Sequence, residues 1–146
     1  MDDASLTLTV KHEPLQSGIW VLSASGTIDF STAAHFEKQL ATLIEKKPSH
    51  VLFDMGSVDY ISSNGLGVLI DLFKKCRKGR IGLGIYDPQL AVRRVLEISK
   101  LNFLITDPDA IGGDSPFTDY LKRHEPERKK RREEKAAQKR PPRLYS

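Results

Sequence analysis

Short apolar runs alternate with segments of helical periodicity along most of this 146-residue chain, and this alternation restricts its fold more than any other feature. Runs typical of buried or half-buried strands cover residues 19–25, 50–54 and 81–86, and a segment long enough for a helix separates each from the next. Parallel strands require such a long crossover connection, which is usually a helix. The order therefore predicts an α/β fold whose sheet is parallel over most of its width.

Three segments repeat apolar residues at intervals of three and four, which is the spacing of one face of a helix. Their apolar positions are Phe36, Leu40, Leu43 and Ile44 in the first, Leu66, Leu69, Ile70 and Phe73 in the second, and Val92, Val95 and Leu96 in the third. The pair Asp87-Pro88 precedes the third segment and is typical of a helix start, with aspartate as the N-cap and proline at the first helical position. We therefore expect amphipathic helices between and after the strands.

An antiparallel element is expected at the N-terminal end of the sheet. Residues 5–11 alternate apolar and polar side chains, and a turn signal at residues 14–18 separates them from the run at 19–25. A short apolar run at residues 103–105 would add a last strand. The sequence thus predicts a single α/β domain over residues 1–121, with amphipathic helices and a mixed, mostly parallel sheet of four to five strands.

Charge is unevenly distributed along the chain. Its net charge is +4, but residues 122–146 contain eleven Lys and Arg residues against four Glu, so the remainder is mildly acidic. This basic C-terminal tail is almost free of apolar residues and cannot bury enough surface to offset its ordering entropy, so we expect it to be disordered or partly helical. Nucleic acid could be bound only through this tail, and its glutamates and single aromatic residue, Tyr145, argue against such binding.

The remaining composition disfavours several classes of protein. No run of about 18 apolar residues is present, and the first residues lack the basic and apolar regions of a secretory signal, so we expect a cytoplasmic protein without membrane insertion. The single cysteine, Cys76, continues the apolar face of the second helical segment and is expected to be buried. The four histidines lack metal-ligand spacing and no nucleotide-binding glycine motif opens a helix, so neither metal nor cofactor is expected.

The segment 57–70, SVDYISSNGLGVLI, has the composition of a loop but runs directly into the second helical segment. Ser62 or Ser63 can cap the helix by accepting a hydrogen bond from its first amides. Gly65 and Gly67 are not explained by capping, because each glycine in a helix costs about 1 kcal/mol relative to alanine. A missing side chain allows a neighbouring strand, a phosphate or a partner protein to approach the backbone closely.

A helix N-terminus with free amides favours anions, so a serine in this segment can carry a phosphate without melting the helix. The phosphate would add a charge of about −2 to the surrounding surface and displace a partner docked there. Asp29 and Asp54 also follow predicted strands, where the carboxyl edge of a parallel sheet collects functional side chains. Either carboxylate can serve such a site or simply cap a turn.

This segment and its surroundings resemble the STAS domain of bacterial anti-sigma factor antagonists. Strand HVLFD precedes the pattern V-x-x-I-S-S-x-G-L-G-V-L-I, and strand IGLGIY and helix DPQLAVRRVLEIS follow it. The sequence Gly26-Thr27-Ile28-Asp29 is similar to the family's Gly-x-Ile/Leu-Asp loop after the second strand. The resemblance covers about residues 5–106 and leaves the tail outside.

The resemblance also implies roles for individual residues. The family pattern is often Asp-Ser-Ser/Thr-Gly-Leu, in which the first serine is phosphorylated. Alignment on Gly65 places Ser63 at this phosphoacceptor, while Ser62 replaces the aspartate and Asn64 the second serine or threonine. The surrounding partner-binding surface would consist of Asp29, Ser62, Asn64, Gly65 and Gly67.

Partner switching, and not enzymatic activity, is the function that the resemblance implies. The dephosphorylated protein would bind an anti-sigma factor serine kinase with a histidine-kinase-like ATPase fold and so free a sigma factor. The kinase would phosphorylate Ser63 and break the complex, and a PP2C-type phosphatase would reverse the modification.

Three alternatives stay open. A STAS subunit of a lipid-trafficking ABC transporter would dock an ATPase through the same surface without phosphorylation. An enzyme could use Ser63 as its nucleophile, although no histidine stands in a recognisable pairing and no G-x-S-x-G elbow is present. An adaptor could bind nucleic acid through the basic tail.

Overall fold

A four-stranded sheet in the order β1-β2-β3-β4 forms the base of the first of two structural units. In the computed structural model, which describes residues 8–108 and 115–138, these units are residues 1–107 and 108–146. The strands are β1 (Leu8–Gln16), β2 (Ile19–Ile28), β3 (His50–Ile61) and β4 (Gly82–Tyr86). Strand β1 pairs antiparallel with β2, whereas the β2–β3 and β3–β4 pairs are parallel. The predicted mixed and mostly parallel sheet is confirmed, although residues 5–7 of the first predicted strand lie outside the described residues.

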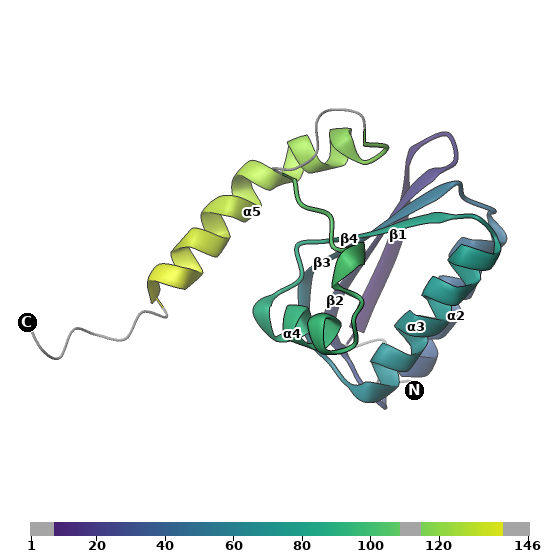
Figure 1. Ribbon diagram of the computed structural model, residues 1–146, viewed down its shortest axis with the longest axis horizontal. Coiled ribbons are helices and arrows are strands. Elements are labelled where there is room, and N and C mark those ends of the chain that lie inside the picture. Colours follow the sequence, from purple (N-terminus) through teal and green to yellow (C-terminus); the bar gives the residue numbers. More distant parts are fainter. Residues whose placement is uncertain (1–7, 109–114, 139–146) are drawn as a thin grey trace, which may run out of the picture. The chain divides into compact units, whose positions relative to one another are not determined.

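Helices connect the parallel strands and pack against the sheet (Figure 1). Their bounds are α2 (Ala33–Glu45), α3 (Ser63–Lys78) and α4 (Leu90–Ile98), and the 3-10 helix η1 (Asn102–Leu104) follows α4. α2 links β2 to β3, and α3 links β3 to β4, which is the alternation that the apolar pattern predicts. α2 and α3 lie side by side and line a shared shallow pocket.

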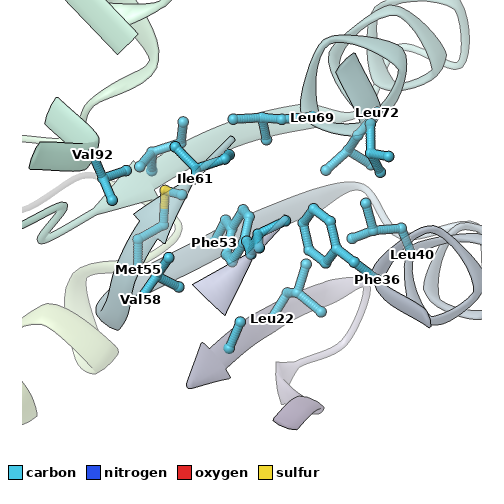
Figure 2. Packing of buried hydrophobic residues seen from close by; sticks show 14 of the residues in the cluster. Leu22, Phe36, Leu40, Phe53, Met55, Val58, Ile61, Leu69, Leu72 and Val92 are labelled. Carbon is cyan, nitrogen blue, oxygen red and sulfur yellow. The ribbon is translucent and has the colours of Figure 1, made fainter. Parts of the chain in front are cut away.

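The core lies between the sheet and the helices, and Figure 2 shows its central residues. The rings of Phe36 and Phe53 are fully buried with centroids 5.6 Å apart, so they join α2 to β3. Leu69 and Leu72 of α3 and Val92 of α4 extend the same cluster. Each large apolar side chain that is buried contributes about 1.5–3 kcal/mol, and this cluster holds the helices on the sheet.

The buried face of α3 extends beyond the predicted one, whose members Leu66, Ile70 and Phe73 are partly buried and pack against the core. The apolar spacing predicts a face of Leu66, Leu69, Ile70 and Phe73. The residues that the structure buries are Gly65, Val68, Leu69, Leu72 and Cys76. Gly65 joins the buried face because it packs against the end of β2, and a glycine has no apolar side chain that would reveal this place in the sequence. The predicted burial of Cys76 is confirmed.

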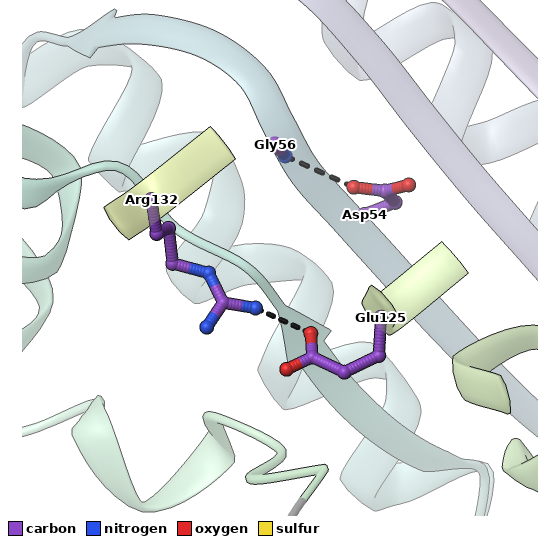
Figure 3. A network of polar contacts seen from close by, with 4 residues as sticks. All are labelled: Asp54, Gly56, Glu125 and Arg132. Atoms are coloured by element: carbon purple, nitrogen blue, oxygen red, sulfur yellow. Dashed lines mark hydrogen bonds and ion pairs between the residues drawn. The ribbon is translucent and has the colours of Figure 1, made fainter. Parts of the chain in front are cut away.

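Strand β3 is longer than the apolar run that predicts it. The sequence predicts a strand over residues 50–54 and a loop-like composition from residue 57, but β3 continues to Ile61. The Asp54 carboxylate accepts a hydrogen bond from the Gly56 amide at 2.9 Å, so the turn-forming contact lies inside the strand (Figure 3). Pairing with β2 shifts its register beyond this point and ends with Ile28 opposite Ile61. Because of this extension, the last residue of β3 lies next to the last residue of β2.

The predicted start of α4 at Asp87-Pro88 is wrong. The helix begins at Leu90 with Gln89 as its N-cap residue. The Gln89 side chain donates a hydrogen bond to the carbonyl oxygen of Gly56 at 3.0 Å and does not cap the helix. Asp87 has a left-handed backbone with φ of 56°, whereas an N-cap residue takes an extended conformation.

The predicted last strand at residues 103–105 is reduced to a single bridge. Its first two residues belong to η1, and Ile105 forms an isolated parallel bridge with Ile85 of β4. The amide of Thr106 donates to the carbonyl oxygen of Ile85 at 2.6 Å. The sheet accordingly has four strands within the described residues, the lower end of the predicted range.

The second unit contains α5 (Thr118–Gln138), which includes residues 122–138 of the predicted basic tail. Within α5, the Arg132 guanidinium forms an ion pair with the Glu125 carboxylate (Figure 3). The tail is helical as far as it is described, and residues 139–146 lie outside the described residues. The predicted boundary between domain and tail falls within this helix and stays a prediction. None of the helices in the described ranges is long and apolar enough to cross a membrane.

Three helices are followed by a residue with a left-handed backbone. Lys47 after α2, Arg80 after α3 and Lys100 after α4 have φ values of 51°, 56° and 60°. After α4, the amide of Leu101 donates to the carbonyl oxygen of Leu96 at 2.8 Å, as in a Schellman motif. Glycine is the usual residue at this position, because a side chain costs about 1–2 kcal/mol in the left-handed region.

Lys100→Gly is expected to raise the free energy of unfolding by roughly 0.5–1 kcal/mol, because glycine removes the left-handed penalty and loses only part of that gain to chain entropy. Urea denaturation of the purified variant measures the change. The control is Lys74→Gly on the exposed side of α3, which should lower stability by about 1 kcal/mol. Equal destabilisation by both substitutions would contradict the capping argument.

Candidate functional site

Ser62 joins the end of β3 to the start of α3. It is the N-cap residue of α3, and its hydroxyl oxygen accepts a hydrogen bond from the Gly65 amide at 3.3 Å. Its own amide donates to the carbonyl oxygen of Ile28, the last residue of β2, at 2.8 Å. The hydroxyl and the amide of Ser62 are therefore both used to build the junction.

Ser63 is the first residue of α3, and its side chain is exposed. In the part of the chain that the structure describes, no hydrogen bond involves its hydroxyl group. The first turn of α3 contains no acidic residue, and the amides at a helix N-terminus favour an anion. The Ser63 hydroxyl is thus accessible at a position that can accommodate a phosphate.

The two glycines of α3 have different surroundings. A Cβ on Gly65 would lie 2.5 Å from the Ile28 Cγ2 atom and 2.8 Å from the Ile28 carbonyl oxygen, both closer than real contacts allow. A Cβ on Gly67 would have no neighbour within 4 Å, and this residue is exposed. The sequence left a neighbouring strand, a phosphate or a partner protein as the group that could approach these glycines closely. For Gly65, this group is the neighbouring strand β2. Gly67 leaves the exposed side of the helix flat.

Asp29 organises the turn between β2 and α2. Its carboxylate accepts hydrogen bonds from the Ser31 hydroxyl at 2.7 Å and from the Ser31 amide at 2.9 Å, and a longer one from the Thr32 amide. The bond from the Ser31 hydroxyl, with further ones from these two amides, holds the pKa of Asp29 below its ordinary value, although partial desolvation opposes the shift. Asp29 is therefore an ionised residue that fixes a turn.

Asp29 and the serine segment lie at the same edge of the sheet. Ile28 pairs with Ile61 at the ends of β2 and β3, so Asp29 and Ser62 each follow a strand end at that edge. Asn64, the second residue of α3, is exposed beside them. The structure thus brings Asp29, Ser62 and Asn64 to one edge, whereas Gly65, which the resemblance assigns to the same surface, is buried under the end of β2. The binding of a partner by this surface stays a prediction.

Asp54 is not brought to this edge. It is a buried residue inside β3, and its carboxylate accepts the hydrogen bond from the Gly56 amide described above (Figure 3). Of the two interpretations that the sequence left open for Asp54, this geometry favours the capping of local backbone.

Sequence reasoning missed two exposed aromatic residues at the site. Phe30, directly after Asp29, is 81% exposed, and Tyr60, directly before Ile61, is 52% exposed. Neighbouring side chains of a strand face opposite ways, so the alternation of Tyr60 and Ile61 was a usable signal. This alternation was not recognised because the predicted strand ended at residue 54. For Phe30, no feature of the sequence beyond its place in a turn indicates an exposed aromatic side chain.

The described residues contain no group of three or more His, Cys, Asp or Glu side chains that could hold a metal ion. Cys76 is buried, and burial raises the pKa of its thiol to about 11. Few thiolates form near neutral pH at such a pKa, which agrees with the packing role predicted for this residue.

Comparison with known proteins supports the resemblance seen in the sequence. The STAS domain family profile matches residues 13–112. BtrV of Bordetella bronchiseptica is 33% identical over 82 residues, which cover 56% of this chain and 71% of BtrV. RsfB of Mycobacterium tuberculosis, named an anti-sigma-F factor antagonist, is 28% identical over 98 residues, which cover 67% of this chain and 77% of RsfB.

The fold is similar to a solved structure of the same kind. A crystal structure of an anti-sigma factor antagonist from Mycobacterium paratuberculosis superposes with a TM-score of 0.61 at 28% sequence identity. The superposition covers 67% of this chain and 82% of that chain. Sequence and fold therefore agree on the family.

Substituting each glycine of α3 by alanine should have opposite effects on stability. Gly65→Ala is expected to destabilise the protein by about 1–3 kcal/mol, because its Cβ would overlap the Ile28 backbone. Gly67→Ala, which meets open space, should stabilise it by up to about 1 kcal/mol through helix propensity. Thermal denaturation of both variants measures the difference, and a stable Gly65→Ala variant would show that the junction is loose.

The two serines should differ in the same experiment. Ser62→Ala removes the helix cap and is expected to cost about 1 kcal/mol of stability. Ser63→Ala removes an exposed hydroxyl without a hydrogen bond, so its effect should stay within about 0.5 kcal/mol. A larger loss for Ser63→Ala than for Ser62→Ala would reverse the assignment of the cap.

Proposed function

The chain belongs to the STAS domain family, and from this membership we propose that it is an anti-sigma factor antagonist that acts by partner switching. Dephosphorylated, it binds an anti-sigma factor serine kinase with a histidine-kinase-like ATPase fold. The kinase phosphorylates Ser63, which ends the binding, and a PP2C-type phosphatase restores the first state. The names of RsfB and of the similar structure from Mycobacterium paratuberculosis support this class of function.

The different exposure and bonding of the two serines carries this proposal. The Ser62 hydroxyl accepts the capping hydrogen bond from Gly65, and a phosphate on it would remove that cap. The Ser63 hydroxyl is exposed at the first position of α3, so a kinase can reach it without unfolding the helix. The phosphoacceptor assigned by the resemblance is therefore also the serine that the local geometry favours.

A phosphate on Ser63 would change the surface and leave the fold intact. The helix N-terminus and its amides stabilise the added negative charge, and the first turn holds no carboxylate that would repel it. A partner seated over the exposed Asn64 and Gly67 would have to desolvate a group of charge about −2, which is costly unless the partner supplies paired cations. Release of the partner follows from this local charge.

The residues around Ser63 divide into two kinds in this proposal. Asn64, Gly67 and the Asp29 turn present accessible groups that the partner contacts. Ser62 and Gly65 act indirectly, because they seat α3 against the end of β2 and so fix the direction in which Ser63 faces.

Incubation with ATP and the purified anti-sigma factor serine kinases of the source organism, one at a time, tests the proposal. Mass spectrometry should find phosphate on Ser63, and Ser63→Ala should abolish the modification while it retains kinase binding. Ser63→Asp should weaken binding at least about tenfold, which is a modest 1.4 kcal/mol. Phosphate on Ser62 alone would overturn the assignment, and unchanged affinity of Ser63→Asp would exclude the charge mechanism. Stable co-purification with a transporter ATPase, without any phosphate, would favour the transporter alternative.

A further inference from the structure

Phe30 is held in an exposed position by the turn around it. Single exposed apolar residues are common and need no explanation by themselves, but Phe30 is 81% exposed at the centre of an ordered turn. The Asp29 carboxylate accepts hydrogen bonds from the Ser31 hydroxyl and amide, and the Asp29 amide donates to the Thr32 hydroxyl at 2.8 Å. Thr32 is itself fully buried, and the Ala33 amide donates to the Asp29 carbonyl oxygen at 2.8 Å. The backbone of Phe30 is therefore bracketed by fixed residues.

The turn lies close to the proposed phosphorylation site. Ile28, two residues before Phe30, accepts the hydrogen bond from the Ser62 amide at 2.8 Å. The path from Phe30 to Ser63 runs back along the chain to Ile28, across this hydrogen bond to Ser62, and on to the next residue. The Cα atoms of Phe30 and Ser63 are therefore at most about 18 Å apart. A standard interface buries about 800 Å² on each partner, which corresponds to a patch roughly 30 Å across. One partner can cover both residues.

Tyr60 adds a second aromatic side chain at the same edge. It is 52% exposed and lies opposite Thr27 in the paired ends of β2 and β3. Ser62 follows it by two residues. Protein interfaces are enriched in aromatic residues, and a few such residues supply most of the binding energy.

We propose that Phe30 is the apolar anchor by which the anti-sigma factor kinase holds this chain, with Tyr60 as a second aromatic contact at the same edge and Asp29 as the residue that positions Phe30. This inference rests on the proposed function. The partner must then present an apolar pocket next to the site from which it transfers phosphate. The prearranged turn reduces the entropy lost on binding, so Phe30 sets the affinity while the charge on Ser63 sets the release.

A matched control is available elsewhere in the unit. Ile98, at the end of α4, is 82% exposed. It belongs to α4, which follows β4, whereas Phe30 and Ser62 come just after the paired ends of β2 and β3. Ile98 thus matches Phe30 in exposure but is not part of the segments that follow these two strand ends.

The test is a binding titration of this protein with the kinase that phosphorylates Ser63. ATP is left out, so that Ser63 stays unmodified. Phe30→Ala should weaken binding at least about thirtyfold, and Phe30→Leu should recover part of that loss. Ile98→Ala should change affinity less than about threefold. Both alanine variants should keep the thermal midpoint of the wild type, because each removes an exposed side chain.

The outcomes separate this inference from the function on which it rests. If the wild type binds and Ser63→Asp weakens binding, but Phe30→Ala binds like the wild type, the anchor is wrong and partner switching stands. If no kinase binds the wild type, both proposals fail. If light scattering shows a wild-type dimer that Phe30→Ala dissociates, the turn contacts a second copy of this chain, and the assignment to the kinase is overturned.

Discussion

The contact between the start of α3 and the end of β2 is the interaction on which the site depends. The Ile28 carbonyl oxygen accepts the Ser62 amide, and Ile28 also fills the space that a Cβ on Gly65 would need. An unpaired buried carbonyl or amide costs about 1–3 kcal/mol, so this bond and this glycine hold the helix at one position. That position determines which serine caps the helix and which one faces solvent.

The same contact divides two adjacent serines between structure and chemistry. Ser62 is used by the junction, and Ser63 is left exposed at the positive end of a helix. A switch by phosphorylation requires a hydroxyl whose modification changes a surface without melting what holds it. Because Asp29 and its turn follow Ile28, the junction also sets the exposed Phe30 at the edge of the sheet where Ser62 lies. In the functions proposed here, one backbone hydrogen bond therefore aligns the chemical group and the apolar anchor.

Much of the fold could be predicted because its signals are local. The strand runs at 19–25, 50–54 and 81–86 and the helical spacing between them depend on near neighbours in the chain, and all appear in the structure. The errors concern contacts between distant segments. The predicted face of α3 left out Gly65, which is buried because it packs against Ile28. Strand β3 runs past its apolar stretch because it pairs with β2 as far as Ile28.

The sequence by itself determined the order of strands and helices, the place of the serine segment before a helix, and the family to which these motifs belong. Periodicity, capping residues and motif spacing are properties of neighbouring residues, so no tertiary contact is needed to read them. Only the tertiary structure decided that Ser62 is the cap, that Gly65 is buried while Gly67 is exposed, and that Phe30 and Tyr60 stand at one edge. The reason is that each of these depends on where the end of β2 meets the end of β3, which are far apart in the chain.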